Sequence, residues 1–145
     1  METRRPAKAL SPKRPAPAPA DPPAGKPGTL ALGRSGEDIA CRYLQGKGFE
    51  ILERGFRLFR GEIDIVARDG ATLVFVEVKA RADESHGRPE EAVTPAKQRQ
   101  IRRIARGYLM TRPAPDADCR FDVIAILFRG PDDFRLEHFV DAFRD

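Results

Sequence analysis

The sequence predicts an α/β fold in which one β-sheet is flanked by helices. Two amphipathic helical patterns enclose a run of strand patterns, and a buried-looking strand follows the second helix. With 145 residues and 41% apolar content, the chain has room for one domain with a modest core. We therefore expect an α-β-β-β-α-β-β order.

The first helix is predicted over residues 35–47. Ser35 opens a capping sequence of the form S-x-x-D, and apolar residues then recur at helical spacing as far as Leu44. Gly46 and Gly48 indicate its end.

Strand patterns fill the middle of the chain. Residues 49–59, 62–67 and 73–79 have the β-branched or alternating character of strands. Asp69 and Gly70 predict a tight hairpin turn between the last two.

The second half of the chain begins with a predicted loop over residues 81–93. Thr94 and Pro95 then indicate the start of a helix that runs to about residue 111. The remaining patterns are a buried strand over 120–127 and a weaker one over 136–140.

Residues 1–28 have a different composition from the rest. They hold 8 of the 13 prolines, six basic residues and two acidic ones. Such a segment has too few large apolar residues to offset the entropy of ordering, so we predict a disordered tail and a domain over 29–145. Because the net charge of the whole chain is also +4, the predicted domain is neutral.

Other features bear on where the protein works. We find no apolar run of the roughly 20 residues that a membrane span needs, and no secretory signal. Cys41 and Cys119 are far apart without metal-ligand spacing, which favours free thiols in a reducing compartment. We expect a cytoplasmic protein that does not enter a membrane.

The predicted hairpin gathers charge on one sheet face. With Asp69 and Gly70 at the centre of the turn, Glu62 faces Glu77, and Asp64 lies diagonal to Glu77 with Cα atoms about 7–8 Å apart. Lys79 projects from the same face. Such charges on a half-buried sheet need a partner, water or a metal. Carboxylate oxygens suit Mg²⁺ or Mn²⁺, and Lys79 could stabilise charge on a phosphate.

The same residues carry a family resemblance. Gly61-Glu62-Ile63-Asp64 and Glu77-Val78-Lys79 resemble the D…(E/D)-x-K signature of the restriction-endonuclease-like superfamily, with Ile63 where a proline often stands. The chain is more closely similar to the YraN-type family over roughly residues 30–145. That match rests also on Gly36-Glu37, Val74-Phe75-Val76, Glu91-Ala92-Val93, Lys97 and Arg120-Phe121-Asp122-Val123.

The YraN-type family is similar in sequence to archaeal Holliday-junction resolvases. This resemblance implies a three-layer core, with a mixed β-sheet flanked by helices, and a metal site. It implies Asp64, Glu77 and Lys79 as catalytic residues, with Glu37 as a further metal ligand. Without the family, Glu37 is an ordinary acid in the first turn of a helix. A two-fold homodimer is expected only by analogy with junction enzymes.

Several other residues have two interpretations each. Lys97 either points inward toward phosphate or lies along the surface at the helix start. Asp122 interrupts an apolar strand and is expected to pair with Lys97 or Arg120, while Glu62 is expected to support the site from outside it. The arginines of the second helix either follow a phosphate backbone or form a solvated face: Arg99, Arg102, Arg103 and Arg106.

Three functions fit these residues. The first is a Mg²⁺- or Mn²⁺-dependent endonuclease that cuts DNA, with branched or damaged DNA as the preferred substrate. The second is a catalytically weak or inactive DNA-binding scaffold in repair or recombination, although no aromatic platform for base stacking is evident. The third is an interaction domain in which the charges form a structural ion-pair network. The intact set of Asp64, Glu77 and Lys79 favours the enzyme.

Overall fold

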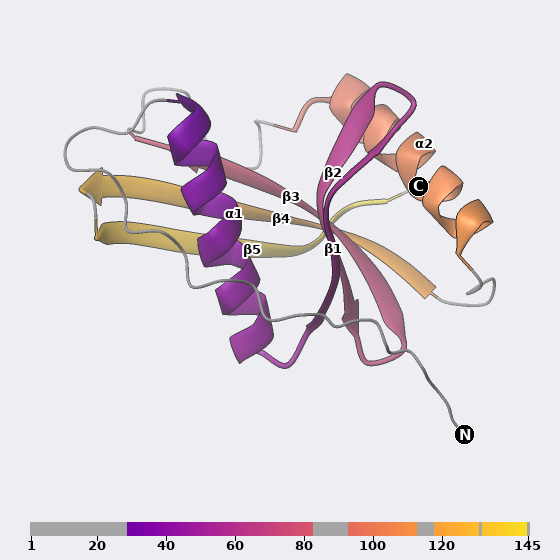
Figure 1. Cartoon of the computed structure of the whole chain (residues 1–145), viewed down its shortest axis with the longest axis horizontal. Coiled ribbons are helices and arrows are strands. Elements are labelled where there is room, and N and C mark those ends of the chain that lie inside the picture. Colours follow the sequence, from indigo (N-terminus) through magenta and orange to yellow (C-terminus); the bar gives the residue numbers. More distant parts are fainter. Residues whose placement is uncertain (1–28, 83–92, 113–117, 131, 145) are drawn as a thin grey trace.

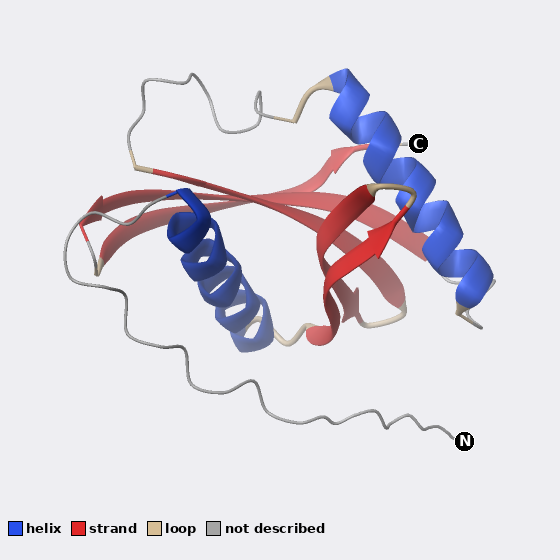
Figure 2. Ribbon diagram, turned by 45° about the horizontal axis from the view of Figure 1, so that its top comes forward, coloured by secondary structure: helices blue, strands red, loops and turns tan. Residues whose placement is uncertain are grey.

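The computed structural model describes residues 29–82, 93–112, 118–130 and 132–144. They form a five-stranded mixed sheet with one helix on each face, which confirms the predicted three-layer α/β architecture (Figures 1 and 2). The elements are α1 (Thr29–Gly46), β1 (Glu50–Leu58), β2 (Gly61–Asp69), β3 (Thr72–Arg81), α2 (Pro95–Thr111), β4 (Asp118–Gly130) and β5 (Asp133–Phe143).

The strands lie in the sheet in chain order. β1, β2 and β3 run antiparallel to one another, β3 and β4 are parallel, and β5 pairs antiparallel with β4 at the other edge. Parallel neighbours require a crossover connection, and α2 lies in the one between β3 and β4. The predicted element order is confirmed.

Side-chain alternation along β2 and β3 builds one core on each face of the sheet. Ile65 and Val74 pack in the cluster that includes Leu44 of α1. Val66 and Phe75 pack in the cluster that includes Tyr108 of α2. The middle of the sheet is therefore buried on both faces. Polar groups can gather only at parts of the sheet that neither helix covers.

Both helices are confirmed, but α1 is longer than predicted. It begins at Thr29 rather than Ser35, because the segment before Ser35 contains good helix formers and the capping-like sequence lies inside the helix. α2 begins as expected: the Thr94 hydroxyl accepts a hydrogen bond from the Lys97 amide at 3.2 Å.

The turn between β2 and β3 is centred differently from the prediction. Asp69 pairs with Thr72, so Gly70 and Ala71 are the two central residues, and Gly70 has a φ of 62°. A hairpin turn with glycine at its first central position needs positive φ only there, which explains why the chain turns one residue later.

This turn moves the strand register by two residues. Ile65 lies opposite Val76, and the same register carries Asp64 opposite Glu77. The predicted pairing of Glu62 with Glu77 is therefore wrong, as is the diagonal position of Asp64. Because the shift is even, every side chain stays on its predicted face.

Some expectations fall on other parts of the chain. The disordered tail over residues 1–28 lies outside the described residues, as does nearly all of the loop before α2. Cys41 is buried and Cys119 is exposed, and within the described ranges neither forms a disulfide. Within the described ranges, no helix is long and apolar enough to cross a membrane.

Candidate metal centre

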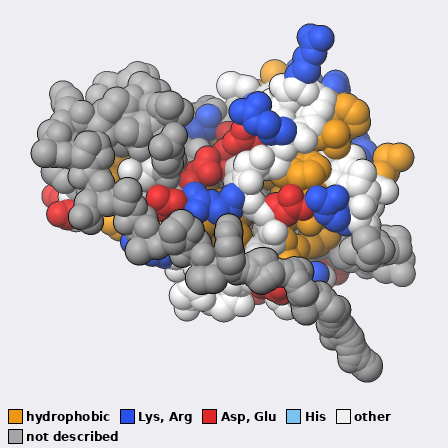
Figure 3. Space-filling view, in the orientation of Figure 1, with side chains coloured by type: hydrophobic (Ala, Val, Ile, Leu, Met, Phe, Trp, Pro, Cys, Tyr) orange, Lys and Arg blue, Asp and Glu red, His pale blue; other side chains and the backbone are white. Residues whose placement is uncertain are grey.

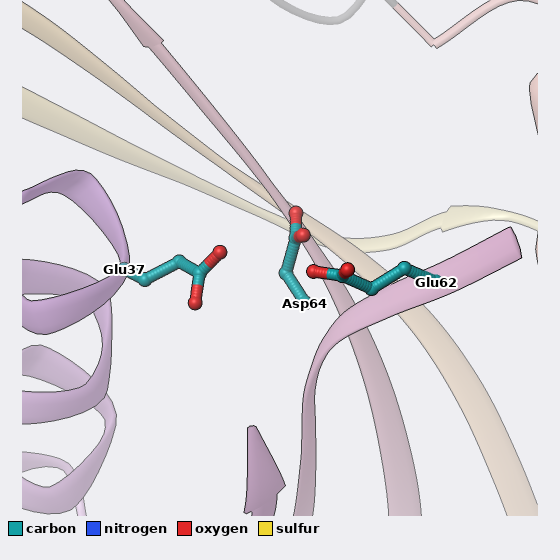
Figure 4. A group of neighbouring side chains, drawn as sticks. All are labelled: Glu37, Glu62 and Asp64. Carbon is teal, nitrogen blue, oxygen red and sulfur yellow. The ribbon is translucent and has the colours of Figure 1, made fainter. Parts of the chain in front are cut away.

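Three carboxylates meet where α1 approaches the start of β2. Glu37 comes from α1, and Glu62 and Asp64 come from β2, where alternation places them on one face. Each offers one oxygen, and these oxygens lie within 4.8 Å of one another. Figure 4 shows Glu37 and Glu62 extending toward Asp64 from opposite sides. We call these three residues the carboxylate cluster.

A close helix–strand approach brings Glu37 into this cluster. A Cβ atom at Gly36 would lie 2.9 Å from the Cβ of Ala80 on β3, a distance that real side chains avoid. The absence of a side chain at Gly36 therefore lets α1 pack tightly against β3. The next residue, Glu37, is carried toward β2 as a result.

Asp64 is held at the point where the paired part of β2 and β3 ends. Its Oδ2 accepts a hydrogen bond of 2.8 Å from the Val78 amide. Burial raises the pKa of Asp64 above its usual value; the Val78 hydrogen bond opposes this rise, and the negative charge of Glu62 adds to it. The carboxyl thus has a fixed orientation in a site that disfavours its negative charge.

Glu77 lies beside Asp64 and faces two lysines. Its Oε2 is 3.6 Å from the Lys79 Nζ and 3.7 Å from the Lys97 Nζ, and its side chain is only 6% exposed. Its Oε1 is buried and has no hydrogen-bond partner among the described residues. Burial and the charge of Asp64 raise the pKa of Glu77 to about 7 against the opposing effect of both lysines.

Glu37 has a similar electrostatic environment. Burial, followed by the charge of Asp64, raises its pKa to about 7. Arg54 on β1 opposes this rise from 3.8 Å, while making a shorter ion pair of 2.7 Å with Asp38. Strongly raised carboxyl pKa values in one location are typical of functional sites.

The structure thus brings together most of the predicted site residues. Asp64 and Glu37 lie in the carboxylate cluster, and Glu77 joins Lys79 and Lys97 next to it. The Lys97 ammonium lies near Glu77, and its contact with phosphate stays a prediction. Glu62, expected only to support the site, is a full member of the cluster; the signal that indicates it is its spacing of two from Asp64 on one strand.

The arginines of α2 lie outside the cluster. Arg99, Arg103 and Arg106 are exposed, while Arg102 donates a hydrogen bond of 3.2 Å to the Arg144 carbonyl. On the face drawn in Figure 3, acidic and basic side chains lie interspersed among apolar patches. This face is electrically mixed, in agreement with the neutral balance of residues 29–145.

Asp122 has a structural environment instead. This fully buried carboxylate accepts hydrogen bonds from Arg120, from the His138 Nε2 at 2.7 Å and from the Asp141 amide at 2.9 Å. Burial alone would raise its pKa, but these donors outweigh it and lower the pKa below the usual value. Of its two expected partners, Arg120 is correct and Lys97 is wrong.

A mixed five-stranded sheet between two helices, with acidic residues and lysines converging on β2 and β3, defines a restriction-endonuclease-like domain. The chain belongs to a family of that superfamily, the uncharacterised protein family UPF0102, whose model matches residues 36–126. The resemblance to the YraN-type family is thereby confirmed.

Relatives at about half identity extend over most of the chain. A UPF0102 protein of Chlorobium limicola is 52% identical over 118 residues, which cover 78% of this chain and 92% of the relative. One of Geobacter sulfurreducens is 52% identical over 112 residues, or 77% and 88% of the two chains. One of Syntrophotalea carbinolica is 54% identical over 114 residues, or 79% and 92%.

Proposed function

We propose that this protein is a metal-dependent endonuclease that hydrolyses DNA phosphodiester bonds. The observation that carries the proposal is the carboxylate cluster of Glu37, Glu62 and Asp64 beside the lysine-flanked Glu77. Gathering these carboxylates at one partly buried place is costly unless a cation binds among them.

The cluster suits Mg²⁺ or Mn²⁺. Carboxylate oxygens are the ligands these hard cations prefer, and oxygens around one octahedral ion are separated by about 3–4 Å. Oxygens within 4.8 Å of one another need only small side-chain movements to reach that spacing. The Oε1 of Glu77, which is buried and has no hydrogen-bond partner in the described part of the chain, offers a further oxygen ligand.

A divalent cation bound here would polarise the phosphodiester and lower the pKa of an attacking water. Lys79 supplies positive charge at the same face, where it can orient that water and stabilise the charge that builds on the phosphorus oxygens. Lys97 adds a second ammonium from α2. The protein thus combines negative groups that hold the ion with positive groups that hold the phosphate.

DNA with branches or damage is the proposed substrate, with repair or recombination as its setting. The family's similarity to junction resolvases supports this choice, and a two-fold homodimer would match a junction with two-fold symmetry. The arginines on α2 are suited to phosphate contacts without sequence readout.

The test is a cleavage assay on labelled four-way-junction and linear DNA with Mg²⁺ or Mn²⁺. Lys79→Ala should lower the cleavage rate by about 10²–10³, because one charge-stabilising group is lost while the carboxylates remain. Lys47→Ala, which removes a lysine from the turn that follows α1, should cut like the wild type. The proposal fails if the wild type cuts no faster than Lys79→Ala.

One observation favours a second function. Glu77 already forms ion pairs with Lys79 and Lys97, as a structural network would. In a scaffold that binds DNA without cutting it, both Lys79→Ala and the wild type would bind junctions and leave them intact. The same assay, read together with a gel shift, separates the two functions.

A further inference from the structure

The tip of the β1–β2 hairpin has an unusual backbone. Phe59 and Arg60 connect the two strands, and both have positive φ values, of 53° and 60°. Two positive φ values are required by the type I′ turn common in two-residue hairpins, but bulky residues such as Phe and Arg rarely adopt them, so these residues are a strained choice here. The turn leaves the ring of Phe59 49% exposed.

Helix α2 supports this tip, as Figures 1 and 2 show. A Cβ atom at Gly107 would collide with Leu58 and approach Phe59 Cε2 at 3.0 Å. Because Gly107 has no side chain, the hairpin can pack directly against the backbone of α2. The guanidinium of Arg103 lies 5.1 Å from the centre of the Phe59 ring. The ring is thus packed against α2 and has the guanidinium of Arg103 over it.

We propose that Phe59, with Arg60 and Arg103, is a stacking site for an unpaired base of a single nucleic-acid strand. An exposed aromatic ring stacks on a base of any sequence, and neighbouring arginines bind the adjacent phosphates. Phe59 would thus be the aromatic platform for base stacking that the sequence alone does not reveal.

This site lies within reach of the carboxylate cluster. Four residues lie between Phe59 and Asp64 along the chain, so their Cα atoms are at most about 17 Å apart. At 3.4 Å per nucleotide, this distance corresponds to no more than about five nucleotides of a stacked strand. A base held at Phe59 would place a nearby phosphodiester at the cluster, so the inference deepens the proposed nuclease function and rests on it for cleavage. The substrate class is DNA with an unpaired segment at a branch.

Binding can be followed by tryptophan fluorescence, because the chain has no tryptophan of its own. EDTA removes divalent cations and so prevents cleavage during the measurement. Phe59→Trp introduces a single indole at the tip, and Phe134→Trp introduces one at a position of similar exposure, 42%, at the start of β5. In EDTA, oligothymidylate should quench the Phe59→Trp emission with a midpoint about tenfold below that of a duplex of equal length. The Phe134→Trp emission should not change. Absence of quenching at position 59, or equal quenching at both positions, overturns the proposal.

A second experiment measures the contribution of the ring. Phe59→Ala should weaken binding of forked DNA about tenfold and leave blunt-duplex binding unchanged, while Phe59→Tyr keeps the wild-type affinity. Arg60→Gly relieves the left-handed strain, so this variant should fold at least as well as the wild type yet bind forks more weakly. Equal fork affinity in Phe59→Ala and the wild type overturns the stacking site.

The two proposals fail in different ways. Quenching at position 59 without any metal-dependent cleavage would support the stacking site and contradict the nuclease. Metal-dependent cleavage in which Phe59→Ala cuts forks at the wild-type rate would support the nuclease and contradict the stacking site.

Discussion

At the residue scale, what separates the carboxyl groups of this protein is the number of donors around them. Glu77 and Asp122 are both buried, yet the pKa of Glu77 is raised to about 7 and that of Asp122 is lowered. Asp122 receives hydrogen bonds from Arg120, His138 and a backbone amide, whereas one Glu77 oxygen has none among the described residues. Burial with few donors therefore distinguishes Glu77 from the structural carboxylate Asp122.

Glu77 should make stability depend on pH. Its folded-state pKa of about 7 lies above the usual 4.5, so the folded state binds this proton more tightly than the unfolded state. The stabilising contribution is complete below pH 4.5 and is lost as the pH rises through 7, a change of roughly 3 kcal/mol. In metal-free buffer, Glu77→Gln should flatten the unfolding free energy against pH, as urea denaturation would measure. An unchanged slope would contradict the assigned pKa.

Asp122→Asn provides the opposite case. It removes the negative charge that Arg120 and His138 share, and breaking such a buried pair costs about 3–5 kcal/mol. Urea denaturation near neutral pH should therefore show a large loss for this variant, unlike Glu77→Gln. Similar losses in both variants would mean that Glu77 is a structural ion pair.

At the element scale, sequence patterns predicted the strands and α2 well because each has clear periodicity and, for α2, a capping residue. The register of the β2–β3 hairpin was not predictable with certainty, since Asp69-Gly70 and Gly70-Ala71 are both able to form turns. That choice moved Glu62 from its expected place opposite Glu77 into the carboxylate cluster. The exposure of Phe59 is not predictable for a related reason. In the sequence, Phe59 reads as the last apolar residue of a strand, and only the position of the turn shows that it is exposed.

The contact between α1 and β3 positions one site residue, and it can be tested. Gly36→Ala inserts a methyl group 2.9 Å from Ala80, so α1 must move and Glu37 with it. Overpacking of this kind costs about 1–3 kcal/mol. Adding Ala80→Gly removes the collision and should restore part of the stability and of the Mn²⁺ affinity, as thermal melting with and without Mn²⁺ would show. Additive losses in the double variant would mean that the two residues do not interact.

At the scale of the whole molecule, charge is divided unevenly along the chain. Residues 1–28 contain six basic and two acidic residues and account for the net charge of +4, while residues 29–145 are balanced. General attraction to DNA is thus expected from the first segment and local chemistry from the folded one. The candidate residues Asp64, Glu77 and Lys79 can be read from the sequence because they lie on two adjacent strands. The position of Glu37 on α1 relative to them requires the fold.

Deleting residues 1–28 should leave the melting temperature unchanged and weaken non-specific duplex binding. Up to six phosphate contacts would be lost, which lowers the slope of log affinity against log salt by up to about 5. Replacing the six basic residues with glutamine in the full chain should give the same result. A large fall in melting temperature would show that this segment packs on the domain.

The central claim is that the carboxylate cluster binds a divalent cation, and calorimetric titration with Mn²⁺ tests it most directly. The wild type should bind Mn²⁺, and Asp64→Asn should bind it at least about tenfold more weakly because a ligand is lost. Asp69→Asn changes an aspartate of the same strand that pairs with Arg120 outside the cluster, so it should bind like the wild type. No Mn²⁺ binding by the wild type, or equal binding by Asp64→Asn, would contradict the account.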